Sequence, residues 1–267
     1  MTFVDAQSGT QRQAATITYE QPLSERLRTY LRLEFLYRQV EFNLRSQDAW
    51  STRSAMSGIL DILAITARGD CRTEALKEVE RQLNLLNTYR DRSGVDTERL
   101  DYIVEQLGHH RTQLNSVPGA FMQNLRDSEF LNAIRHRSAI PGGTCEFDLR
   151  DFYHWLNQDF ATRKIDFDTW MTDIRILCEA VTCLLWVTRE NARPRRETAV
   201  GGQFHLNLDR ENPCQLVRIT LPSGTDLFPE ISGSHYRCSL RFLKWQGVNS
   251  RPIQTEQDIP FLLTTCS

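Results

Sequence analysis

Helical periodicity dominates the first two thirds of the chain. Apolar residues recur three or four positions apart, as at Leu27, Tyr30, Leu31 and Phe35, and this is the spacing of an amphipathic helix. The same spacing returns after the middle of the chain and is longest between residues 160 and 191. The pattern predicts one helix that begins at Ser24 and four further helices, at residues 51–68, 128–137, 151–157 and 160–191.

A helical hairpin is predicted between residues 70 and 117. Two successive segments carry apolar residues at helical spacing, namely Leu76, Val79, Leu83 and Leu86, then Leu100, Ile103, Leu107 and Leu114. The pair Ser93-Gly94 favours a turn between the segments. Asp70 and Asp96 stand where a side chain can cap the first turn of a helix. We therefore expect two antiparallel helices here.

Alternation with a period of two replaces the helical pattern from Gln203 onward, as expected for strands with one buried face. The residues expected on buried faces are Phe204, Leu206 and Leu208, then Val217, Ile219 and Leu221, then Tyr236, Cys238, Leu240 and Phe242. Residues 16–20 and 259–265 are predicted to be further strands.

The two patterns meet at a stretch of backbone-breaking residues. Pro141, Gly142 and Gly143 should end the preceding helix, because proline lacks an amide donor and glycine reaches conformations closed to other residues. The following residues, 145–149, alternate like a strand. We therefore interpret residues 140–149 as a junction between domains.

These elements predict an α+β fold, in which a mainly helical domain with a helical hairpin packs on a smaller antiparallel β-strand domain. The expected divisions are a flexible N-terminal tail at 1–15, a helical domain at 16–138 and 151–193, and a β-strand domain at 139–150 and 194–267. The length of 267 residues is ample for two hydrophobic cores.

Composition and charge narrow the functional classes. The net charge of −2 gives no global basic field that would attract nucleic acid. Among the 32 basic residues only Lys77, Lys164 and Lys244 are lysines. Arginine suits the recognition of carboxylates, although a codon bias towards arginine explains the skew equally well. The longest apolar run, 59–67, contains Asp61, so no membrane span is predicted. The seven scattered cysteines are expected to be reduced thiols, as in a cytoplasmic protein.

Residues with catalytic or metal-binding potential are scattered. The sequence contains no phosphate-binding loop, nucleophile elbow or HExxH motif. Adjacent histidines, at 109 and 110, diverge on a helix, and the seven cysteines include no CxxC pair. Cys178 and Cys183 are expected to be buried thiols, and Asp166 and Asp168 to be helix caps. No catalytic residue, metal or cofactor is therefore assigned.

A pair of arginines on one predicted strand is the best candidate for a binding surface. Alternation places Arg237 and Arg241, with His235, on the face opposite the buried residues, about 13 Å apart along the strand. Such a pair could grip an acidic or extended peptide. It could equally serve only to keep an exposed sheet soluble and to protect its edge. Smaller basic groups occur at 135–137 and at 193–196.

Several stretches together resemble the ZapD family of bacterial cell-division proteins. They are residues 22–36, 68–78, 138–143, 147–149, 155–156 and 227–233, followed by Arg237 and Arg241-Phe242. They occur in the family's order. The resemblance implies a helical domain, a β domain and a symmetric dimer. It also implies a non-enzymatic partner of FtsZ, the tubulin-like GTPase of the division ring, that binds the C-terminal tail region of FtsZ, bundles its filaments and acts at mid-cell.

The resemblance also implies that basic side chains contact FtsZ. The residues expected to do so are Arg32, Arg68, His154, Arg195, Arg237 and Arg241. This chain departs from the family pattern at two places. Tyr153 stands where relatives often have a histidine, with His154 shifted by one, and Glu129 stands at a position that is basic in close relatives.

Two other classes of function remain as alternatives. The arginine-rich patches could bind nucleic acid, with aromatic residues such as Tyr236 or Trp245 stacking on bases. Tyr236 is expected to face the core, which argues against this use. A hydrolase whose catalytic groups come from distant positions is the third class, but the sequence offers no activated nucleophile.

Overall fold

The computed structural model describes residues 15–267 with the exception of 91, 93, 118–120, 210–212 and 235–236. The expected N-terminal tail, 1–15, therefore lies almost wholly outside the described residues. The chain forms two compact units. We refer to Arg28–Arg189 as the helical unit, and to the residues up to Leu27 together with Glu190–Ser267 as the β unit. The α+β class predicted from the sequence is confirmed.

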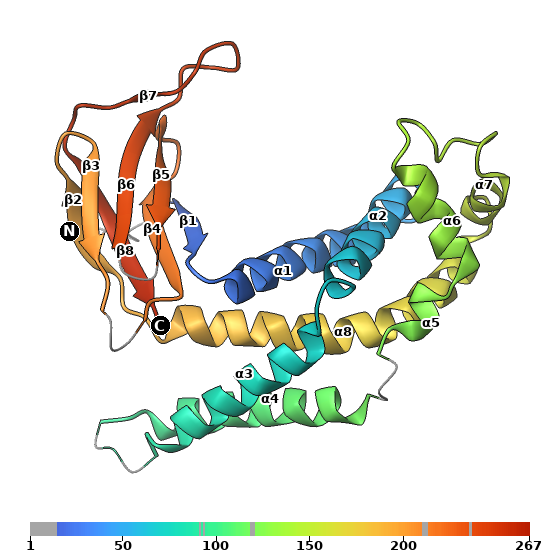
Figure 1. Cartoon of the computed structure of the whole chain (residues 1–267), viewed down its shortest axis with the longest axis horizontal. Helices are drawn as coiled ribbons and strands as arrows, with labels where there is room; N and C mark the ends of the chain where they lie inside the picture. Colours follow the sequence, from blue (N-terminus) through green and yellow to red (C-terminus); the bar gives the residue numbers. More distant parts are fainter. Residues whose placement is uncertain (1–14, 91, 93, 118–120, 210–212, 235–236) are drawn as a thin grey trace, which may run out of the picture. The chain divides into compact units, whose positions relative to one another are not determined.

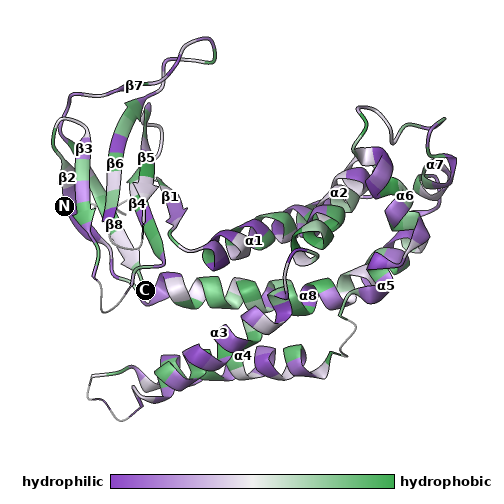
Figure 2. Cartoon of the chain, viewed as in Figure 1, coloured by the Kyte–Doolittle hydropathy of each residue, from purple (hydrophilic) through white to green (hydrophobic). Residues whose placement is uncertain are grey.

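The helical unit is built around its longest helix, α8 (Figure 1). The helices, of which only the start of α1 and the last residue of α8 fall in the β unit, are α1 (Glu25–Asn43), α2 (Ala49–Thr66), α3 (Cys71–Asn87), α4 (Thr97–Ser116), α5 (Gln123–Arg126), α6 (Glu129–Ser138), α7 (Arg150–Leu156) and α8 (Phe160–Glu190). Along α8 the residues Met171, Ile174, Leu177, Val181 and Leu184 are buried at helical spacing. This helix therefore supplies a continuous strip of the unit's core, and its hydrophobic residues recur along its length (Figure 2).

The predicted helical hairpin is confirmed as α3 and α4, which lie side by side (Figure 1). The carboxylate of Asp70 accepts a hydrogen bond from the amide of Thr73 at 3.0 Å, and that of Asp96 from Arg99 at 3.1 Å. Both aspartates therefore cap their helices as expected. Gly94 adopts a φ of +85° in the turn, whereas Ser93 lies outside the described residues.

The strand predicted at 145–149 is wrong. Residues 141–148 form consecutive turns, in which the amides of Gly143 and Cys145 donate to the carbonyls of Ile140 and Gly142 at 2.9 and 3.0 Å. Gly142 has a φ of +74°, and a Cβ on Gly143 would stand 2.4 Å from a carbonyl of α6. The glycines thus allow a compact connection between α6 and α7. The stretch 139–150 belongs to the helical unit and not to the β domain.

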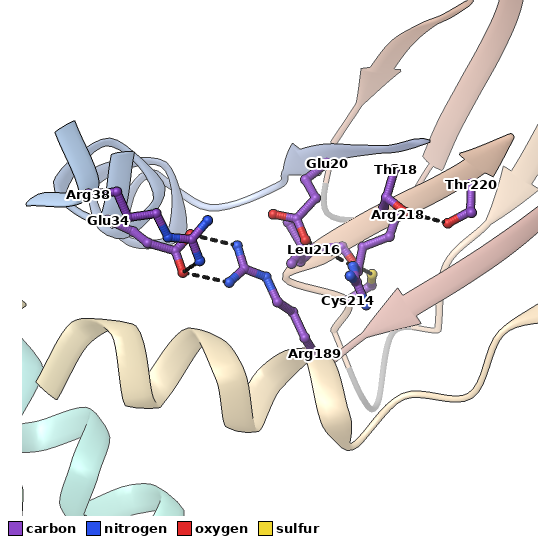
Figure 3. A network of polar contacts seen from close by, with 9 residues as sticks. All are labelled: Thr18, Glu20, Glu34, Arg38, Arg189, Cys214, Leu216, Arg218 and Thr220. Atoms are coloured by element: carbon purple, nitrogen blue, oxygen red, sulfur yellow. Dashed lines mark hydrogen bonds and ion pairs between the residues drawn. The ribbon is translucent and has the colours of Figure 1, made fainter. Parts of the chain in front are cut away.

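A bidentate ion pair joins α1 to α8 inside the helical unit (Figure 3). The two amino groups of Arg189 lie 2.7 and 2.8 Å from the two carboxylate oxygens of Glu34, whose side chain is only 5% exposed. Arg38, one turn along α1, adds a third contact at 2.9 Å. Because the carboxylate of Glu34 is removed from water, these arginines are needed to offset the free-energy cost of burying its charge.

The β unit contains two antiparallel sheets. The first has the order β1 (Thr16–Pro22), β4 (Leu216–Pro222), β8 (Ile259–Cys266) and β2 (Arg195–Ala199). The second has the order β3 (Gln203–Asn207), β6 (Arg237–Lys244) and β5 (Leu227–Gly233), and β7 (Ile253–Gln254) pairs with β6. The ring of Phe261 on β8 lies 5.3 Å from those of Phe204 and Phe242 on the second sheet. The inner faces of the two sheets therefore share one core.

Three features of the β unit differ from the sequence prediction. Strand β1 pairs with β4 and so belongs to the β unit, although 16–138 was assigned to the helical domain. Arg195 and Arg196, noted above only as part of a basic group, belong to β2, a strand that the sequence did not predict. Strand β5, which contains Pro229, was also not predicted. Proline is tolerated there because β5 stands at the end of its sheet's strand order, beside β6.

Candidate protein-binding surface

Strand β6 presents its two arginines on one outward face, as the alternation predicted. Cys238, Leu240 and Phe242 are buried, whereas Arg237 and Arg241 are exposed. His235 and Tyr236, which were assigned to this strand, lie outside the described residues. The arginines therefore stand on the solvent side of the second sheet, about 13 Å apart by strand geometry.

The neighbouring strands place a carboxylate against one of these arginines. In the register of the sheet, Arg241 lies opposite Gln203 on β3 and opposite Glu230 on β5. Its guanidinium forms an ion pair with Glu230, and the two side chains are 58% and 49% exposed. Arg237 lies opposite Asn207 and, within the described part of the chain, forms no ion pair. Sequence reasoning missed Glu230 because β5 had not been recognised.

Arg195 belongs to the other sheet. It begins β2, and its guanidinium lies 2.8 Å from the carboxylate of Glu197 on the same strand. The structure thus does not bring Arg195 into the sheet that carries Arg237 and Arg241. Its charge is locally balanced within β2.

Arg32 and His154 are both exposed residues of the helical unit. Arg32 lies on α1, one helical turn before Phe35, whose side chain is 68% exposed. His154 lies on α7, and the side-chain amide nitrogen of Gln158 donates to its Nε2 atom at 2.9 Å. Arg32 therefore stands beside an exposed aromatic residue, whereas His154 is held by its own helix and the residues that follow it.

Arg68 lines a pocket of about 430 Å³ between the end of α2, the start of α3 and α5. Arg72 and Arg126 also line it, and both are held by backbone carbonyls: Arg72 donates to Leu114 at 2.8 Å and Arg126 to Thr66 at 3.2 Å. Asp70 is the acidic member, and hydrogen bonds from Thr73 hold its pKa below the usual value. Three cations and one carboxylate make this pocket suited to an acidic group.

The thiols are poorly suited to nucleophilic chemistry. Burial raises the pKa of Cys183 and that of Cys238 to about 11, and it raises the pKa of Cys178 further above its usual value. These groups stay protonated near neutral pH, and the thiolate is the reactive form. No cluster of metal-ligating side chains occurs among the described residues. None of the described helices is long and apolar enough to span a membrane.

Comparison with known proteins assigns a family to this architecture. The family model of ZapD, described as a cell division protein, matches residues 31–241. Cell division protein ZapD of Azoarcus sp. strain BH72 is 35% identical over 251 residues, which cover 94% of this chain and 99% of that protein. Cell division protein ZapD of Methylococcus capsulatus strain Bath is 34% identical over 250 residues, which cover 94% and 98%.

These matches extend across both units, from the helices to the strand that carries the arginine pair. A similar match is found with cell division protein ZapD of Cupriavidus necator, which is 34% identical over 252 residues, covering 94% of this chain and 99% of that protein. The protein is thus of the cell-division class. More specifically, the chain belongs to the ZapD family.

Proposed function

We propose that this protein binds the C-terminal tail region of FtsZ and cross-links FtsZ filaments, which stabilises the division ring at mid-cell. The observation that carries the proposal is the pair Arg237 and Arg241 on one outward face of β6, in a chain of the ZapD family. Two exposed guanidinium groups on a rigid sheet attract an acidic segment and orient it, because each can hold a carboxylate with two parallel hydrogen bonds.

Cross-linking requires at least two binding surfaces per particle. A two-fold dimer supplies two identical surfaces. A weak contact at each surface then becomes strong along a polymer, because the second contact is effectively intramolecular. We therefore propose a homodimer as the functional form, with no cofactor, nucleic acid or membrane insertion required.

The outer face of α1 is our candidate for the dimer contact. Phe35 and Phe42 are seven residues apart on this helix, hence on one side of it, and are 68% and 72% exposed. Exposed aromatic residues on one helix face are typical of an interface. Replacing both with serine should convert the dimer to a monomer in analytical ultracentrifugation. The matched control is Ile165→Ser, which removes an exposed apolar side chain from α8; a dimer that survives the double replacement refutes this placement.

The first test is sedimentation of FtsZ with GTP, with and without this protein, at two salt concentrations. We expect GTP-dependent co-pelleting that increases with the protein and weakens with salt, because exposed charges are screened. Absence of co-pelleting at both salts, with a folded dimer in hand, refutes the assignment of FtsZ as the partner. A gel shift with a steep salt dependence would then test nucleic acid instead.

The second test locates the surface. Arg237→Glu combined with Arg241→Glu should abolish co-pelleting while the circular dichroism spectrum is unchanged. A double variant with the same change in net charge, Lys77→Glu with Arg111→Glu, alters exposed residues of α3 and α4 and should retain bundling. Equal loss in both double variants would show that net charge, and not this face of β6, governs binding.

A further inference from the structure

The outward face of β6 changes character beyond the arginines. Leu243 is two residues after Arg241 and therefore points to the same side of the sheet. It lies opposite Phe228 on β5, and both side chains are half-buried. Trp245 lies just beyond the end of β6, two residues after Leu243, and is 50% exposed; continued alternation would place it on the same face. The same face is thus basic at one end and apolar at the other.

The register fixes the order of these groups across the sheet. Arg237 pairs with Asn207, Ser239 with His205, and Arg241 with Glu230. The next row outward is Leu243 with Phe228, and the amide of Trp245 donates to the carbonyl of Asp226 at 2.7 Å. Successive rows are about 6.6 Å apart. An extended segment along β6 would therefore meet two cations and, about 7 Å beyond the second, an apolar surface.

Cross-strand contact with Leu243 explains why Phe228 is half-buried, since such pairs stabilise sheets. It does not explain Trp245, which leaves half of its large side chain in water at the end of this row. Aromatic residues in this position are the usual anchors of protein-binding surfaces. The polar rows beside it supply the charge complementarity that an acidic partner needs.

We propose that this face recognises a bipartite segment, in which acidic side chains contact Arg237 and Arg241 and an apolar or aromatic side chain packs on Leu243, Phe228 and Trp245. The inference rests on the proposed function and specifies the chemistry of the partner's tail. The charges provide attraction over a distance, whereas the apolar contact provides affinity that salt does not screen. Burial of one large apolar side chain is worth about a tenfold change in affinity or more.

The test measures binding of a fluorescent peptide from the C-terminal tail of FtsZ to the full-length protein at low and high salt. Trp245→Ala should weaken binding about tenfold at both salts. Leu243→Thr should act in the same direction, and Arg237→Gln should weaken binding at low salt more than at high salt. The matched control is Ile253→Ser on β7, because Ile253 pairs with Lys244, which strand alternation assigns to the side of the sheet opposite Leu243.

The outcomes separate this inference from the proposed function. If Trp245→Ala and Leu243→Thr bind the peptide as tightly as the wild-type protein does, the proposal of a bipartite face is refuted, whereas the proposal of FtsZ binding is not. A loss from Ile253→Ser equal to that from Trp245→Ala also refutes it, because the effect would not follow the face. Wild-type protein that binds neither the peptide nor FtsZ filaments refutes the proposed function itself. Thermal unfolding of each variant identifies any that fails to fold. If Leu243→Thr does not fold, Trp245→Ala decides the question, because the side chain of Trp245 is exposed.

Discussion

Replacing Glu230 with glutamine tests whether the protein competes with its own partner for Arg241. In the free protein, the carboxylate of Glu230 forms an ion pair with the guanidinium of Arg241. Under the proposed function, an acidic side chain of FtsZ would displace it, so part of the new attraction would be offset by the ion pair that is lost. Glu230→Gln keeps the shape of the side chain and removes its charge. We therefore expect the variant to bind the FtsZ tail peptide more tightly than the wild-type protein.

The size of the gain follows from the exposure of the pair. Both side chains are about half exposed, at 58% and 49%, so water and salt screen their attraction. Exposed ion pairs contribute about 0.2–1 kcal/mol. The corresponding gain in affinity is roughly 1.5-fold to 5-fold. The free energy of unfolding should fall by no more than about 1 kcal/mol, because the same pair is all that the sheet loses.

Fluorescence anisotropy with the labelled peptide at about 50 mM and 300 mM salt measures the effect, and the gain should shrink at the higher salt. A second measurement combines Glu230→Gln with Arg241→Gln. In this background, removing the charge of Glu230 cannot free a guanidinium group at position 241. The gain should then be smaller, as a double-mutant cycle reports directly. A variant that binds tenfold more weakly than the wild-type protein would refute the reasoning, because Glu230 would then contact the partner itself.

Three further predictions concern the fold. Glu34→Ala removes the carboxylate that accepts two hydrogen bonds from Arg189 of α8 and should lower the free energy of unfolding in urea by about 3 kcal/mol. A loss below about 1 kcal/mol would contradict this prediction. Burial lowers the pKa of His110 below 6.5, so the folded state favours the neutral ring. The contribution of His110 to the free energy of unfolding is therefore fully present above about pH 6.5 and decreases as the pH falls through and below that value. His110→Phe should reduce this loss of stability between pH 7.5 and 5. Gly143→Ala should lower the free energy of unfolding by about 1–3 kcal/mol, because the added Cβ would stand 2.4 Å from a carbonyl oxygen. The control Gly108→Ala in α4 has open space around it and should leave the free energy of unfolding unchanged or raise it by up to about 1 kcal/mol. Similar values for the two variants would refute the steric argument.

The design of the proposed surface has a consequence for filament bundling. Because Arg241 is partly neutralised and Arg237 is exposed, a single surface should bind weakly and exchange quickly. Weak contacts that act in pairs hold filaments together only where many surfaces are present at once. Such a protein would respond to assembled filaments more strongly than to isolated FtsZ molecules.

Local patterning by itself determined most of the helical unit. Helix periodicity and capping act over a few residues, so the hairpin of α3 and α4 and its caps Asp70 and Asp96 were predicted correctly. Period-two alternation likewise predicted that Arg237 and Arg241 share an outward face. The same local reasoning failed at residues 145–149, because an alternating pattern fits a series of turns as well as it fits a strand.

Only the tertiary structure decided what lies beside each element. Strand β2 forms through pairing with β8, 60 to 68 residues later in the chain, and its own composition gives little strand signal. The ion pair between Glu230 and Arg241 and the cross-strand pairing of Phe228 with Leu243 depend on the register between β5 and β6. Register is set by the buried faces of whole strands and not by the residues that it brings together on the surface. The sequence therefore identified the arginines, and the fold determined which charges and apolar groups stand next to them.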